Sequence, residues 1–152
     1  MLVEVQALVT KSHLAVPRRV ATGMDYNRLV LLAAVLSKRG GVPFHDHDIH
    51  LNVVGGLRIE ETAADLGAAL AMLSSFRDAP LDPSTVFIGE IGLAGELRGV
   101  ANLPLRLREA AKLGFRRAVV PRRAALGPRD GSELEVIAAG TLREAAQRAG
   151  VQ

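Results

Sequence analysis

The segment 86–121 constrains the fold more than any other part of the chain. It opens with the apolar run Val86–Ile88 and continues as Gly-Glu-Ile-Gly-Leu-Ala-Gly-Glu-Leu-Arg. Glycines at this spacing favour a tight turn, so residues 86–92 and 96–100 are predicted to pair as a β-hairpin.

A helix and a further strand are predicted directly after the hairpin. Asn102 is suited to cap the helix, and Pro104 is suited to its first turn, because the N–H that proline lacks has no partner there. Gly114 is typical of the position that follows a helix end. Residues 115–120 are mostly apolar and predict a buried strand.

The remaining segments alternate between strands and helices in the same way. Strands are predicted at 2–9, 17–23 (an edge strand), 49–54 and 134–137, and helices at 26–39, 62–75 and 141–150. Residues 29–36 are apolar almost all round, so the first helix is expected to be largely buried. Asp25 is expected to cap that helix, and Thr62–Asp65 and Thr141–Glu144 have the spacing of capping boxes. Residues 122–132 are predicted to form a basic loop, and this loop is expected to be mobile.

No internal repeat or linker is present, so residues 1–152 are expected to form a single domain. Its class is α/β (α+β), with a mixed sheet, a β-hairpin and about four helices. Hydrophobic residues make up 49% of the chain and charged residues 23%, which is typical of a globular protein. The absence of cysteine excludes disulfides and thiolate zinc sites. Without an apolar run long enough for a membrane span and without a signal peptide, we expect a cytoplasmic protein.

Arginine dominates the basic residues, because the only lysines are Lys11, Lys38 and Lys112. Arginines stand in adjacent pairs at 18–19, 116–117 and 122–123. The guanidinium group matches phosphate in a bidentate manner, although solvated surface charges are the alternative, and the net charge of +3 is modest. Aromatic residues are only 3% of the chain, which argues against a base-stacking platform for single strands, so any nucleic-acid contact is expected to be mainly to the backbone.

The segment His45–His50 contains five potential metal ligands in six residues. The alternative is a polar loop that leads into the strand at 49–54. No helical His-x-x-x-His pair or distant third ligand accompanies the segment, so no metal site is expected there.

Several blocks together resemble one known family. They are residues 3–9 (VEVQALV), 25–29 (DYNRL), 89–98 (GEIGLAGELR), 112–121 (KLGFRRAVVP) and 141–145 (TLREA). The chain resembles the C-terminal domain of the bacterial recombination protein family RadA (Sms), which is itself similar to the proteolytic domain of Lon-type peptidases. The resemblance implies the Lon-like fold, also called ribosomal protein S5 domain 2-like.

The same resemblance implies that a catalytic pair has been lost. Lon-type peptidases use a serine activated by a lysine, and both groups are required. Matching the motifs puts Asp65 at the serine position and Pro104 at the lysine position, so no peptidase activity is expected. For Asp65, two alternatives stay open: a general acid or base acting with Glu90, or a carboxylate favoured by a helix N-terminus.

The family normally carries a zinc-binding segment and a RecA-like ATPase before this domain. No P-loop sequence occurs in the chain, so no cofactor is expected here; ATP, Mg and Zn are implied only for those other domains. The resemblance implies a DNA-dependent ATPase that promotes branch migration of recombination intermediates together with the recombinase machinery. In that setting the Lon-like domain is implied to be a scaffold of a ring, expected to be hexameric, and a DNA-contacting surface, with no membrane partner.

Arginines are the predicted phosphate contacts. The first choices are Arg18, Arg19, Arg28, Arg106 and Arg108, and the second choices are Arg58, Arg116, Arg117, Arg122 and Arg123. Two alternatives remain: an oligomerisation module without DNA contact, and a Lon-type hydrolase with a rearranged site.

Overall fold

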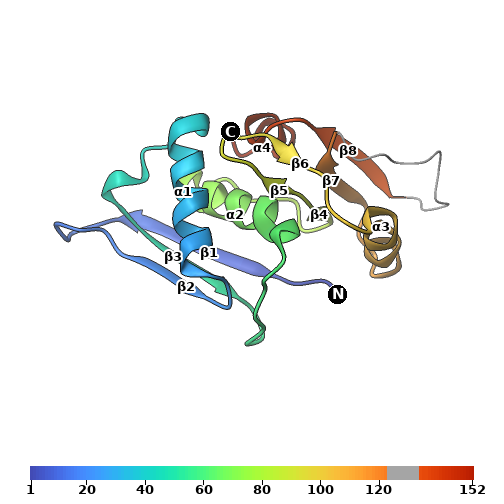
Figure 1. Cartoon of the computed structure of the whole chain (residues 1–152), viewed down its shortest axis with the longest axis horizontal. Helices are drawn as coiled ribbons and strands as arrows, with labels where there is room; N and C mark the ends of the chain where they lie inside the picture. Colours follow the sequence, from blue (N-terminus) through green and yellow to red (C-terminus); the bar gives the residue numbers. More distant parts are fainter. Residues whose placement is uncertain (123–133) are drawn as a thin grey trace.

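Two sheets of three strands and a separate two-stranded hairpin form the framework of the part of the chain that the structure describes (Figure 1). This computed structural model describes residues 1–122 and 134–152, so the predicted loop at 122–132 lies almost wholly outside the described residues. The strands are β1 (Val5–Lys11), β2 (Arg19–Thr22), β3 (His47–Val53), β4 (Thr85–Phe87), β5 (Glu90–Ile91), β6 (Leu97–Arg98), β7 (Arg117–Pro121) and β8 (Glu135–Ala139). The helices are α1 (Tyr26–Gly40), α2 (Asp65–Arg77), α3 (Leu103–Lys112) and α4 (Leu142–Ala149), with short 3-10 turns at Phe44–Asp46 and Thr62–Ala64.

The first sheet has the order β1-β3-β2 and is mixed. Strand β1 runs antiparallel to β3, and β2 runs parallel to it. Ile49, Leu51 and Val53 point to the core while His50 and Asn52 are exposed, as the alternation of strand side chains requires. The predicted edge position of β2 is confirmed.

Helix α2 lies in the middle of the molecule, between the first sheet and the second (Figure 1). Its residues Leu66, Leu70 and Met72 are fully buried. A helix that is apolar on most sides needs such a central position, because each side must find a packing partner.

Helix α1 is less buried than its sequence predicts. Leu29, Leu32 and Leu36 pack into the core, but Tyr26 is 53% exposed and Val30 is 40% exposed. The prediction of a largely buried helix is therefore wrong on one face. The core contacts α1 from one side, so apolar residues on its other side stay exposed.

The second sheet has the order β4-β7-β8 and is wholly parallel. The apolar run Val86–Ile88, which we expected to begin the hairpin, supplies β4 of this sheet instead. The hairpin is confined to β5 and β6, where Glu90 faces Arg98 and Ile91 faces Leu97. A strand of a parallel sheet is covered on both faces and reads as a continuous apolar run, which explains the difference.

Two of the four predicted N-terminal caps form side-chain hydrogen bonds, and the predicted cap at Asn102 is wrong, because its side chain makes no cap bond to α3. Asp25 caps α1 by accepting from the Arg28 N–H at 3.2 Å. Thr141 caps α4 by accepting from the Glu144 N–H at 3.1 Å, and Pro104 lies in the first turn of α3. The predicted capping box of Thr62 and Asp65 is wrong, because no side-chain cap bond forms there and the Asp65 carboxylate is used elsewhere.

Asp82 fastens the start of β4 to its neighbours. Its carboxylate accepts from the Ser84 N–H at 3.0 Å, from the Thr85 hydroxyl at 2.9 Å and from Arg117 Nη1 at 3.1 Å. The hydrogen bonds from the backbone N–H and hydroxyl of Ser84, with smaller help from Arg117, lower the pKa of Asp82 from 3.8 to about 2. The folded state therefore prefers the ionised carboxylate.

Replacing this carboxylate should change the acid dependence of stability. A lowered folded-state pKa means that Asp82 contributes stability above its ordinary pKa of 3.8 and loses this contribution as the pH falls to about 2. In urea unfolding, the midpoint difference between wild type and Asp82→Asn should be constant at neutral pH and should shrink between about pH 4 and pH 2. A midpoint difference that does not change over that range would contradict this assignment.

Candidate functional site

Asp65, the first residue of α2, is the one charged side chain buried in the described part of the chain, with 1% exposure. Its Oδ1 accepts from Arg28 Nε at 2.8 Å, and its Oδ2 accepts from Arg28 Nη2. The Ile91 backbone N–H donates to Oδ2 at 3.1 Å. Both carboxylate oxygens are thus engaged by groups of the chain itself.

Arg28 reaches Asp65 from the first turn of α1. A helix dipole disfavours a cation in that turn, so the position is unfavourable unless a carboxylate compensates the charge. The hydrogen bonds to Asp65 raise the pKa of the Arg28 guanidinium above its ordinary value, against the opposing effect of partial burial.

The backbone around Asp65 is joined to the segment before β5. Leu66 N–H donates to Gly89 O at 3.1 Å, and Gly89 N–H donates to Ala63 O at 3.0 Å. A Cβ at Gly89 would lie 3.3 Å from Pro121 Cγ, so a larger residue would crowd the end of β7. The site therefore lies where α1, α2, β5 and the second sheet meet.

A groove of about 520 Å³ lies beside the start of α2. Ala63, Ala64 and Gly67 line it, together with Phe87 of β4 and Arg106 of α3. The residues that line the groove do not include Asp65 or Pro104. A molecule in this groove would meet the small side chains beside Asp65 and not its carboxylate.

This geometry bears on the chemistry of the predicted catalytic positions. A nucleophile or general base must present a free lone pair to the substrate. Asp65 is buried with its oxygens occupied, and the exposed Pro104 has no basic group. Glu90, the suggested acid–base partner, is half-buried and makes no hydrogen bond with Asp65.

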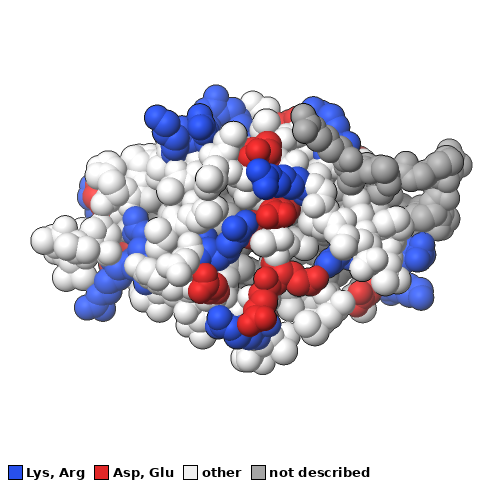
Figure 2. Space-filling view, viewed as in Figure 1, with Lys and Arg blue, Asp and Glu red and all other residues white. Residues whose placement is uncertain are grey.

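The five arginines predicted to contact DNA are not brought together. Arg28 pairs with Asp65, Arg106 donates to Glu61 at 2.7 Å, and Arg19 donates to Phe44 O at 2.9 Å and to His47 O. Arg18 and Arg108 are exposed and have no carboxylate partner among the described residues. On the face drawn in Figure 2, acidic and basic side chains alternate across the centre, and no broad basic surface forms there.

Most of the second-choice arginines are also paired. Arg58 lies 3.4 Å from Glu60, Arg117 contacts Asp82 and Glu135, and Arg122 contacts Glu144. Arg116 is exposed. Arg123 lies outside the described residues.

Sequence reasoning missed a different basic group, made of Lys38, Arg39 and Arg143. Arg143 Nη2 donates to the Arg39 backbone O at 3.0 Å, which joins the start of α4 to the end of α1. These residues are 104 positions apart in the chain, so no local pattern could have indicated the group.

The predicted absence of a metal site at His45–His50 remains a prediction. Asp46 pairs with Lys11 at 2.7 Å, which is the main cause that lowers the pKa of Asp46 to about 2, and Asp48 accepts from the Arg18 N–H. His47 packs its ring edge against Phe76. Within residues 1–122 and 134–152, no three histidine or acidic side chains converge on a common point. Over the same ranges, every helix is too short or too polar to span a bilayer.

Removing Arg28 should be costly, because it leaves the buried Asp65 carboxylate without its counter-charge. We expect Arg28→Met to lower the free energy of unfolding by about 3 kcal/mol or more, measured by urea denaturation. Arg106→Met is the matched control, because Arg106 pairs with Glu61, which is 67% exposed, and should cost less than about 1 kcal/mol.

The double variant Arg28→Met/Asp65→Leu should be more stable than Arg28→Met alone, because it removes the unpaired charge. Equal costs for Arg28→Met and Arg106→Met would show that the Arg28–Asp65 pair contributes little.

Comparison with known proteins identifies the family of the chain. It is 51% identical over 146 residues to a protein of Pseudomonas aeruginosa named DNA repair protein RadA, covering 95% of this chain and 32% of that protein. Proteins of the same name from Escherichia coli and Bacillus subtilis are 55% and 45% identical over 121 and 145 residues, covering 80% and 95% of this chain. The chain spans 26% and 32% of their lengths.

A family model described as subunit ChlI of Mg-chelatase also matches residues 28–124, which is more than half of the chain. The predicted resemblance to the RadA family is confirmed by the relatives. The chain therefore belongs to the family described by the model of subunit ChlI of Mg-chelatase, and it is homologous to the C-terminal region of DNA repair protein RadA.

Proposed function

We propose that this chain is a non-catalytic scaffold domain of a DNA-repair protein that contacts the DNA backbone and takes part in ring assembly. The observation that carries the proposal is the closed Arg28–Asp65 pair, which occupies the position that the Lon resemblance assigns to a nucleophile. The relatives named DNA repair protein RadA support the repair role.

Loss of peptidase chemistry follows from the two replaced positions. The carboxylate of Asp65 is withdrawn from the groove, and Pro104 offers no base. The residues that line the groove include no paired nucleophile and base among the described part of the chain, so they offer no route to hydrolysis. The alternative of a rearranged Lon-type hydrolase has no support in this geometry.

The finer part of the proposal concerns the whole protein, of which this chain matches about a third or less. There, a DNA-dependent ATPase would promote branch migration in the bacterial cytoplasm, with ATP, Mg and Zn held by other domains. The present domain would form a hexameric ring and hold duplex or branched DNA through phosphates. Because phosphate contacts carry no sequence information, this binding should show no sequence preference.

A second candidate is an oligomerisation module that does not touch DNA. The observation that favours it is the internal pairing of Arg19, Arg28 and Arg106, which uses three of the five predicted contacts. Light scattering that shows an oligomer, together with absent DNA binding, would favour this candidate.

DNA binding that depends steeply on salt is the predicted outcome for this chain. Fluorescence anisotropy with a labelled duplex and a labelled branched DNA should give a dissociation constant that rises linearly with salt on logarithmic axes, with slope of about 0.9 for each phosphate contact. Two unrelated sequences of equal length should bind alike. An affinity that is the same at about 50 and 200 mM salt would contradict DNA backbone contact.

A further inference from the structure

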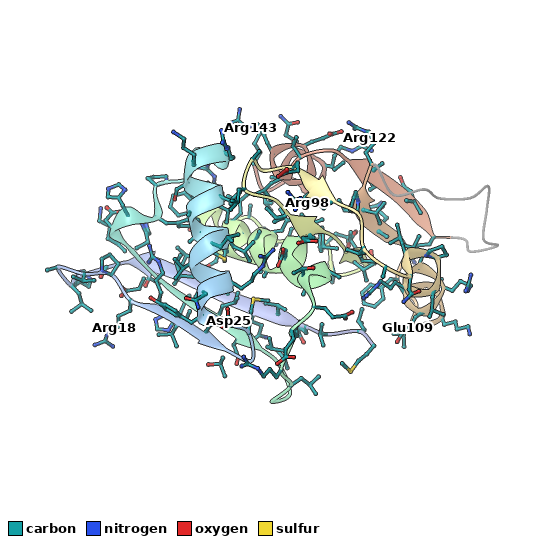
Figure 3. All side chains as sticks on the ribbon, in the orientation of Figure 1. Arg18, Asp25, Arg98, Glu109, Arg122 and Arg143 are labelled. Atoms are coloured by element: carbon teal, nitrogen blue, oxygen red, sulfur yellow. The ribbon has the colours of Figure 1, made fainter. Side chains whose placement is uncertain are left out.

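The end of α1 and the start of α4 carry a basic group that no ion pair among the described residues neutralises. We call Lys38, Arg39 and Arg143 the α1–α4 basic edge. All three residues are exposed. In Figure 2, blue side chains gather over the upper end of α1 with no red among them, and Figure 3 labels Arg143 beside that helix end.

Contacts of the backbone fix the elements that carry the three cations. Arg143 Nη2 donates to Arg39 O at 3.0 Å, and Leu142 N–H donates to Gly95 O at 2.8 Å. A Cβ on Gly95 would lie 3.1 Å from Arg39 Cβ, so the turn between β5 and β6 packs closely against Arg39. The basic edge therefore rests on three fixed elements.

Two acidic residues, Glu144 beside Arg143 in the chain and Glu96 beside Gly95 in the β5–β6 turn, are already occupied. Glu144 accepts from the Gly140 N–H at 2.9 Å and pairs with Arg122, and these contacts lower its pKa. Glu96 accepts from the Ala94 N–H at 3.2 Å and lies 3.7 Å from Arg98. Neither acid pairs with the basic edge among the described residues.

Helix dipoles explain the positions of only some of the three cations. Lys38 and Arg39 lie in the last turn of α1, where the dipole favours cations. Arg143 lies in the first turn of α4, where the dipole disfavours them, and its neighbours are two further cations. A guanidinium has five N–H donors, and the bond to Arg39 O uses one of them. The others remain suited to an anion.

We propose that the α1–α4 basic edge is the main DNA phosphate contact of the domain, ahead of the arginines that sequence reasoning selected. This inference rests on the proposed function, because it identifies where the DNA contact is made. The edge presents three exposed cations on fixed elements without competing carboxylates, and phosphate oxygens are the matching partner. With only backbone contacts, the edge would hold DNA of any sequence.

The test compares two charge-matched triple variants of the full chain. Lys38→Gln/Arg39→Gln/Arg143→Gln removes the basic edge, and Lys11→Gln/Arg77→Gln/Lys112→Gln removes three exposed cations from other positions. Binding to a labelled duplex is measured from about 50 to 300 mM KCl. Thermal unfolding of both variants confirms that each is folded.

Loss of three phosphate contacts should reduce the logarithmic salt slope by about 2.7 and weaken binding at about 100 mM salt at least tenfold. The control triple should change the slope by less than about one. An edge variant with the wild-type slope, or a control that loses as much as the edge variant, would overturn the inference while leaving the proposed function intact. A wild-type chain that binds no DNA would overturn both.

A second variant protects the test against misfolding. Lys38→Gln/Arg39→Gln keeps Arg143 and its hydrogen bond, because the acceptor is the backbone oxygen of residue 39. Its salt slope should fall by about 1.8. A folded double variant with the wild-type slope would count against the basic edge.

Discussion

The pairing of Arg28 with Asp65 is the interaction on which the rest of the structure depends. A carboxylate with 1% exposure is tolerable only when its charge and its lone pairs are satisfied. Three elements meet this requirement together: α2 supplies Asp65, α1 supplies the guanidinium, and β5 supplies the Ile91 N–H. Any change in the relative position of these elements would leave a buried charge without its partner.

The constraint extends from this point to the far side of the molecule. Two hydrogen bonds join the hairpin that contains Ile91 to the start of α4. Leu97 N–H donates to Gly140 O at 3.0 Å, and Leu142 N–H donates to Gly95 O at 2.8 Å. The end of α1 contacts the same region, the start of α4 and the β5–β6 turn, through Arg39. The buried pair and the basic edge therefore lie at two ends of one hydrogen-bonded assembly, which is consistent with the proposed scaffold role.

Local patterns in the sequence predict most of the elements but few of the contacts between them. Caps at Asp25 and Thr141 and the strand at 49–54 follow from neighbouring residues, so they can be read from the chain. The partner of Asp65 is 37 residues away, and its identity depends on how two helices pack. The same limit applies to the exposed face of α1, since periodicity shows which residues are apolar and not whether a second layer covers them. The long separation in sequence likewise explains why the position of Arg143 beside Arg39 was not predicted.

Hydrogen exchange of the Ile91 amide tests most directly whether Asp65 is enclosed by the chain. This N–H donates to a buried carboxylate, so it should exchange as slowly as the core amides of β7, with a rate limited by global unfolding. Exchange as fast as that of the amides around Leu93, whose side chain is 71% exposed, would contradict the account. Asp65 would then be open to solvent, and the scaffold interpretation would lose its physical basis.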